Sequence, residues 1–204
     1  IDKNALEKFL HYGYFIEDDT WFGSVKLIQG ASLIKFCLST GSIERSTYWS
    51  WDKIRPVSGR IDIREAGQEW GRLFTNAVRK RVKPGERAGL TLSGGLDSRA
   101  ILAAFPDDYG QVQTATFGKK NCIDIDIARK ASVVKKAKHH VFELDSENWL
   151  QPRILGVWIT DGQLSIRDMH GIECIQSIAE VFNINLNGLG GDGIHGGSFL
   201  TSVR

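Results

Sequence analysis

The sequence predicts an α/β protein: a doubly wound parallel sheet with a small N-terminal helix and a β-hairpin as its lead-in. From residue 88 onward, apolar runs typical of strands alternate with helical patterns. Strands that are separated by helices pair in parallel through right-handed crossovers. The 204 residues are 42% hydrophobic and 25% charged, which is ordinary for a folded domain.

The N-terminal part predicts a helix over residues 2–14, which ends near Gly13 because glycine favours helix ends. Residues 33–38 and 43–51 read as strands joined by a turn, and so predict a hairpin. We assign residues 1–58 to a lead-in segment packed on the domain that follows.

Residues 63–82 give the clearest helical pattern, with apolar side chains spaced three and four apart. Asp62 and Glu65 have the spacing of a capping box at its start. The sequence from Lys83 to Glu86 ends this helix with proline and glycine.

The remaining elements belong to the predicted sheet domain, residues 59–204. Its strands are expected at 88–93, 112–117, 140–144 and 184–189, and its helices at 97–105, 124–137 and 167–182. Residues 145–164 are expected to be irregular.

The loop from Leu92 to Ser98 carries the strongest functional signal. Its glycines allow consecutive N–H groups to point at one anion, and the following helix adds the positive end of its dipole. Asp97 would repel a bare phosphate, so its expected role is to hold a divalent cation that the phosphate shares. The alternative is an ordinary glycine-rich turn between a strand and a helix.

Three segments end strands of the predicted sheet: Ser93–Gly95, Thr116–Gly118 and Gly188–Gly193. In open α/β sheets, ligands bind beyond the carboxyl ends of the strands. We therefore expect these segments to form one site.

The composition argues against several partners. A net charge of +2 gives no reason to expect nucleic acid or a membrane surface, and no apolar run approaches the ~20 residues of a membrane span. The three cysteines are scattered, which favours reduced thiols in a cytoplasmic protein. The chain starts at Ile1 without a signal-peptide pattern and is expected to be a piece of a longer or processed product; a homodimer is left open.

The segment Leu92-Ser93-Gly94-Gly95-Leu96-Asp97-Ser98 resembles the SGGxDS signature of the ATP pyrophosphatase (PP-loop) superfamily. Downstream, Asn187–Asp192 and Gly196–Phe199 are similar to segments of the synthetase domain of glutamine-hydrolysing asparagine synthetases. The resemblance implies an adenine nucleotide α-hydrolase-like fold that continues past residue 204.

The same resemblance implies that ATP and Mg²⁺ bind here. Asp97 and Asp192 would coordinate Mg²⁺ between the ATP phosphates. The residues implied to contact ATP are Leu92, Ser93, Gly94, Gly95, Leu96, Asp97, Ser98, Thr116, Phe117, Gly118, Gly190 and Gly191. A small-molecule carboxylate would be adenylated with release of pyrophosphate, and ammonia or an amine would then displace AMP.

The sequence departs from this family in the segment from which a glutamate would assist the attack of the nitrogen nucleophile. Leu189 and Gly193 stand where the family has glutamates, and a leucine cannot accept a proton. His195 could take up acid–base work and completes the expected catalytic set with Asp97 and Asp192, although a histidine in such a place is more often a polar loop residue.

Residues 160–170 are expected to line the pocket of the acid substrate. Asp161, Arg167 and His170 are the candidates, and Arg167 could pair with a substrate carboxylate. The alternative is a helix cap formed by Ser165 or Asp168 beside a solvated arginine.

The function predicted from the sequence is therefore an ATP-dependent, AMP-forming carbon–nitrogen ligase. The family's N-terminal glutaminase domain is not in this sequence, so nitrogen would come from a separate glutaminase domain or subunit, or from another donor. Another PP-loop enzyme and a degenerate Mg-ATP-binding module remain as alternatives.

Overall fold

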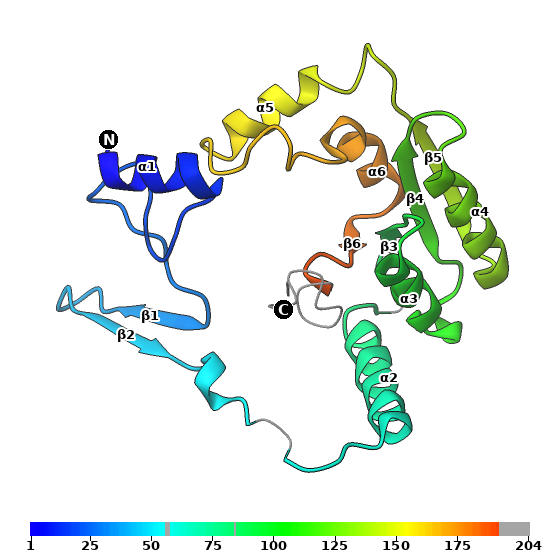
Figure 1. Cartoon of the computed structure of the whole chain (residues 1–204), viewed down its shortest axis with the longest axis horizontal. Coiled ribbons are helices and arrows are strands. Elements are labelled where there is room, and N and C mark those ends of the chain that lie inside the picture. The colour runs from blue at the N-terminus through cyan, green and yellow to red at the C-terminus, as the bar shows by residue number, and fades with distance from the viewer. Residues whose placement is uncertain (56–57, 84, 192–204) are drawn as a thin grey trace, which may run out of the picture. The chain divides into compact units, whose positions relative to one another are not determined.

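A computed structural model describes residues 1–55, 58–83 and 85–191 of the chain. The described residues fall into two compact units, which we treat separately (Figure 1). The hairpin unit comprises Ile1–Ile61 and Val157–Met169, and the sheet unit comprises Asp62–Gly156 and the residues from His170 onward.

The hairpin unit begins with helix α1 (Lys3–Tyr12). The Asp2 carboxylate accepts the N–H groups of Asn4 and Ala5, and Gly13 ends the helix in the left-handed conformation with a φ of 80°. The predicted first helix is thus confirmed.

Strands β1 (Ser32–Phe36) and β2 (Ile43–Thr47) pair antiparallel and confirm the predicted hairpin. A short 3₁₀ turn, η1 (Trp51–Lys53), follows. None of the residues in the two strands is buried within the described residues of this unit.

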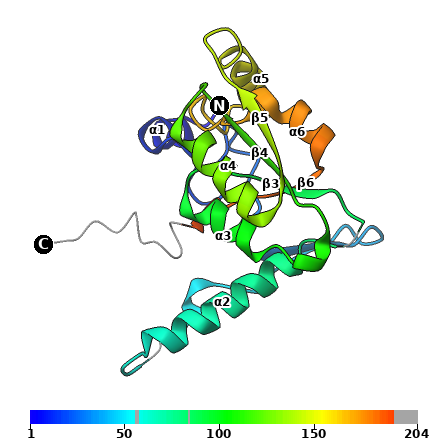
Figure 2. The ribbon, with the colours of Figure 1, turned by 90° about the vertical axis from the view of Figure 1, so that its right-hand side faces the viewer.

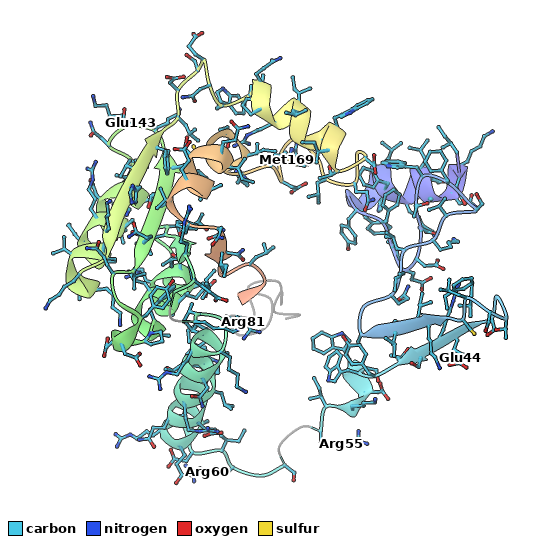
Figure 3. The ribbon with its side chains drawn as sticks, turned by 180° about the vertical axis from the view of Figure 1, so that it is seen from behind. Glu44, Arg55, Arg60, Arg81, Glu143 and Met169 are labelled. Atoms are coloured by element: carbon cyan, nitrogen blue, oxygen red, sulfur yellow. The ribbon has the colours of Figure 1, made fainter. Side chains whose placement is uncertain are left out.

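The sheet unit starts with helix α2 (Ile63–Arg79), where the Asp62 carboxylate accepts the N–H groups of Arg64 and Glu65. At the other end, the Arg81 guanidinium donates to the carbonyl of Ala77 (Figure 3). Nearby side chains therefore satisfy some of the unpaired backbone groups at both ends of the helix.

Four parallel strands form the sheet: β3 (Ala88–Thr91), β4 (Gln113–Gly118), β5 (Lys138–Glu143) and β6 (Ile184–Leu186). Their order is β5-β4-β3-β6, and every neighbouring pair is parallel. Helices α3 (Leu96–Ala104) and α4 (Ile123–Lys135) cover one face, and α6 (Ile175–Val181) covers the other (Figure 2). This is the predicted doubly wound α/β fold.

The core has one layer on each face of the sheet. Leu90 and Leu92 belong to the cluster under α3 and α4, whereas Ala115 packs with Ile178 and Phe182 on the opposite face. At Gly89, a Cβ atom would lie 2.4 Å from the Phe182 ring, so only glycine allows that ring to pack on the strand.

Two expectations for the second half were wrong. Residues 145–164 are not irregular throughout, because helix α5 spans Gln151–Ile159. Pro152 stands in its first turn, where no intrahelical N–H bond is lost. The helix expected over 167–182 is confined to the turn η3 (Ile172–Cys174) and α6, because Gly171 is left-handed with a φ of 88°.

The remaining short element is the turn η2 (Asp107–Tyr109) between α3 and β4. In the described part of the chain, no helix has the length and apolar character needed to cross a bilayer. The division into residues 1–58 and 59–204 stays a prediction.

Candidate active site

A cavity of about 360 Å³ lies at the carboxyl ends of β3, β4 and β6. The chain runs from β3 outward to β4 and β5 and then returns to add β6 on the other side of β3. Ligands bind at such a reversal of strand order, because the loops there diverge. The lining residues are Thr91, Leu92, Ser93, Gly95, Asp97, Ser98, Ala115, Thr116, Phe117, Asp124, Asn187 and Gly188.

The loop after β3 differs from the expected anion nest. The N–H of Ser93 donates to Ser98 Oγ at 3.1 Å, that of Gly94 to Asp124 Oδ1 at 2.8 Å, and that of Gly95 to Ser93 Oγ at 3.1 Å. All three loop N–H groups therefore have acceptors within the protein. The reason is that short oxygen-bearing side chains lie within reach of the loop backbone.

The start of α3 is the better anion site. Gly95 precedes the helix and has no side chain that could accept from its first N–H groups. Leu96, Asp97 and Ser98 form the first turn of the helix, whose N–H groups have no intrahelical partner. This end also carries the positive end of the helix dipole, which attracts phosphate.

Asp97 lies against the loop that follows β6. A Cβ at Gly188 would be 2.6 Å from Asp97 Cβ, and one at Gly191 would be 3.0 Å from the Asp97 carboxylate. Gly190 between them has a φ of 82°. Glycines are thus required for this loop to approach Asp97, and they bring two distant segments to one point. Asp192, Gly193 and His195 lie outside the described residues.

The second wall of the cavity is the end of β4. Thr116 is buried and donates its hydroxyl to the carbonyl of Leu92, which ties β4 to the end of β3. Phe117 lines the cavity and is backed by Gly171, where a Cβ would lie 2.8 Å from the Phe117 ring. Gly171 leaves room for this ring because it has no Cβ, and its φ of 88° also favours glycine.

The remaining residues expected to contact ATP are near the cavity without lining it. They are Gly94, Leu96, Gly118, Gly190 and Gly191. Asp124 and Asn187 line the cavity and were not expected there. A sequence signal could have identified Asp124: it stands in the first turn of the helix that follows β4, and so lies near the carboxyl end of that strand.

The three residues expected to hold the acid substrate are divided between the two units. Asp161 and Arg167 belong to the hairpin unit, whereas His170 belongs to the sheet unit, and none lines the cavity described above. The Asp161 carbonyl accepts from Trp21 Nε1 at 2.8 Å, and Ser165 Oγ donates to Asp168 Oδ2 at 2.7 Å. The substrate role of the three residues stays a prediction.

A larger hollow of about 820 Å³ lies in the hairpin unit, beside Trp49 and Trp51. None of the residues expected to bind ATP, metal or acid lines it. Volume alone does not mark a reaction site, so we assign the chemistry to the smaller cavity, where a helix start, a carboxylate and close glycines converge. Within the described ranges, no group of three His, Cys, Asp or Glu side chains is arranged to hold a metal ion.

Comparison with known proteins matches residues 69–202 to the asparagine synthase family. The chain is 28% identical over 152 residues to the glutamine-hydrolysing asparagine synthetase of Mus musculus, covering 72% of this chain and 26% of that protein. It is 23% identical over 208 residues to a protein of Methanocaldococcus jannaschii provisionally named asparagine synthetase [glutamine-hydrolyzing] 2, covering 100% of this chain and 40% of that protein.

The chain therefore spans well under half the length of these relatives. Among solved structures, an NH3-dependent NAD synthetase from Campylobacter jejuni is 13% identical, with a TM-score of 0.36 over 60% of this chain and 51% of that one. That score is too low to support an inference about this chain.

Proposed function

The chain belongs to the asparagine synthase family, and from this premise we propose that it is part of an ATP-dependent, amide-forming ligase that binds Mg-ATP in the cavity beyond β3, β4 and β6. The carboxylate substrate would be activated as an acyl-adenylate. Ammonia or an amine would then convert it to an amide.

One observation carries the proposal: the open start of α3 and the Asp97 carboxylate meet the glycine loop after β6 in a single cavity. The helix start would bind the β and γ phosphates. Thr116 and Phe117 form the wall where the adenosine part would lie. Because the segments that form the cavity follow three different strands, the site depends on the parallel sheet being intact.

The donor set at Asp97 fits Mg²⁺. Its carboxylate is a hard oxygen ligand, and Gly188 and Gly191 leave space beside it that side chains would fill. Asp97 would hold the ion, and Asp192 is the second ligand that we propose. When bound, Mg²⁺ would neutralise charge on the phosphates.

The proposed reaction has two steps. A carboxylate oxygen of the acid attacks the α phosphorus, the bond to the bridging oxygen breaks, and pyrophosphate leaves. The nitrogen nucleophile then attacks the acyl carbon, AMP leaves with the electron pair of the C–O bond, and the nitrogen loses a proton. The chain's residues would chiefly bind and orient the reactants.

The second step needs a proton acceptor. Leu189 is 95% exposed and offers no basic atom. We propose His195 as the candidate base. The exposed Leu189 also supports a second function, a Mg-ATP-binding module that forms no amide.

Product analysis separates these functions. The full-length protein is incubated with Mg-ATP and a panel of carboxylic acids, with and without ammonia. The ligase should release AMP and pyrophosphate only with its acid. Release of ADP and phosphate would refute it, and Mg-ATP binding without isotope exchange between the bridging and non-bridging oxygens of ATP would favour the binding module.

A further inference from the structure

Asp124 lies outside the β3 loop and α3, and its side chain contacts the backbone of the loop at Gly94. It stands in the first turn of α4, and its Oδ1 accepts the N–H of Gly94 at 2.8 Å. The two residues are 30 positions apart in the chain. The contact therefore links the helix after β4 to the loop after β3.

The fit between the two residues is close. A Cβ at Gly94 would lie 2.6 Å from Asp124 Oδ1 and 3.1 Å from Ile127 Cδ1. Gly94 has no positive φ, so its backbone conformation does not itself require glycine. The space that Asp124 needs is the reason why a side chain is excluded there.

The Gly94 contact also decides which N–H groups remain for an anion. Since the loop N–H groups already have protein acceptors, the phosphate donors are those at the start of α3, two residues further along. Where α3 begins depends on the path of the loop. A group that holds Gly94 therefore holds the start of the phosphate-binding helix.

We propose that Asp124 is a positioning residue for nucleotide binding: its carboxylate anchors Gly94 and so keeps the start of α3 aimed into the cavity. The inference rests on the proposed function, because it assigns ATP to that cavity. Asp124 would not touch the reacting atoms. Its negative charge is exposed and already hydrogen-bonded, so water and the Gly94 N–H reduce its repulsion of phosphate.

Asp124→Ala removes the acceptor and leaves the Gly94 N–H without its partner. We expect the dissociation constant for Mg-ATP, measured by calorimetry, to rise about tenfold to a hundredfold, as for loss of a hydrogen bond to a charged group. In turnover, KM for ATP should rise while KM for the acid stays unchanged. Hydrogen exchange of the peptide covering the loop should accelerate.

Asp124→Asn is the decisive variant, because its amide oxygen can accept the same N–H without a negative charge. It should bind Mg-ATP more tightly than Asp124→Ala, because a neutral acceptor keeps the anchor although its hydrogen bond is weaker than that of the carboxylate. If it binds as weakly as Asp124→Ala, the charge matters rather than the anchor, and the proposal is wrong. Tighter binding by Asp124→Ala would contradict it as well.

Asp126 supplies a matched control. It is a second acidic residue in the first turn of α4 and lies 3.8 Å from Arg129 rather than against the loop. Asp126→Ala should leave nucleotide affinity and loop exchange unchanged. An equal effect of the two alanine variants would mean that general charge or helix stability is responsible.

A double variant tests the contact itself. Gly94→Ala should weaken Mg-ATP binding because its Cβ meets the Asp124 carboxylate, and Gly94→Ala with Asp124→Ala should bind no more weakly than Asp124→Ala alone. Additive losses would contradict the anchor. If the unaltered protein binds no Mg-ATP, the proposed function fails, while loop exchange in the Asp124 variants still tests the positioning role.

Discussion

The β3–β6 sheet and the β1–β2 hairpin have similar local sequence patterns and very different environments. Leu90 on β3 is 0% exposed, whereas Leu33 on β1 is 61% exposed. Figure 3 shows the side chains of both regions, with Glu44 on the hairpin and Glu143 at the end of β5. Local sequence patterns predicted strands in both places, but they did not determine what covers the strands.

The difference follows from the number of layers. Two-stranded hairpins bury little by themselves, whereas the parallel sheet has helices on both faces. The parallel sheet also brings loops from distant segments together at one edge. The site is therefore expected to depend on the sheet unit, and the following substitutions test that expectation.

The largest expected effect is on turnover. Asp97→Ala should reduce amide formation or pyrophosphate release by about 10²- to 10³-fold, as for removal of one electrostatic group from an active site. Glu44→Ala on the hairpin is the matched change, because Glu44 is an exposed carboxylate 3.5 Å from Lys35. Equal losses in the two variants, or normal turnover by Asp97→Ala, would show that the site is misassigned.

The next effect is on stability. Leu90→Ala should lower the free energy of unfolding by about 2–5 kcal/mol, because it leaves a cavity in the core. Leu33→Ala should cost less than about 1 kcal/mol because most of its side chain is already exposed. Urea unfolding measures both, and a cost at Leu33 as large as that at Leu90 would mean that the hairpin face is buried in the folded protein.

A smaller effect of opposite sign is expected at exposed glycines. Gly67 lies within α2 and has open space around it, so Gly67→Ala should stabilise the sheet unit by about 1 kcal/mol through helix propensity. Gly30, in the hairpin unit, also has open space but lies outside any helix, so Gly30→Ala should change stability by less than about 0.5 kcal/mol. Destabilisation by Gly67→Ala would reveal a contact to the exposed side of α2.

The smallest effect concerns thiol chemistry. Hydrogen bonds from Ser39 and Thr40 lower the pKa of Cys37 to about 6, whereas burial raises the pKa of Cys174. Because the thiolate is the reactive form, alkylation of Cys37 should increase as the pH rises through about 6 and then level off, while Cys174 stays unreactive in the folded protein. Mass spectrometry of iodoacetamide-treated protein measures both thiols.

Ser39→Ala provides the control, since it removes the main hydrogen bond to the Cys37 sulfur. It should move the midpoint of alkylation to higher pH. An unchanged midpoint would mean that the hydrogen bonds do not set the acidity of this thiol.

Local signals predicted much of the secondary structure. The Asp62 cap, the helix end near Gly13 and the apolar runs of the four strands each depend on neighbours in the chain, so they can be read from a short window. Helix α5 was missed because Pro152 looks like a helix breaker unless its place in the first turn is known. The helix expected from 167 was too long because Gly171 is left-handed where it packs against Phe117.

The sequence by itself determined the α/β class, the glycine loop after the first strand of the sheet and the carboxylate at Asp97. Only the tertiary structure decided which N–H groups of the loop remain for an anion, because the N–H of Gly94 donates to Asp124. It also decided that the loop after β6 approaches Asp97 closely at Gly188 and Gly191. These contacts join segments that follow different strands of the sheet. They depend on strand order and register, and a pattern of local periodicity contains neither.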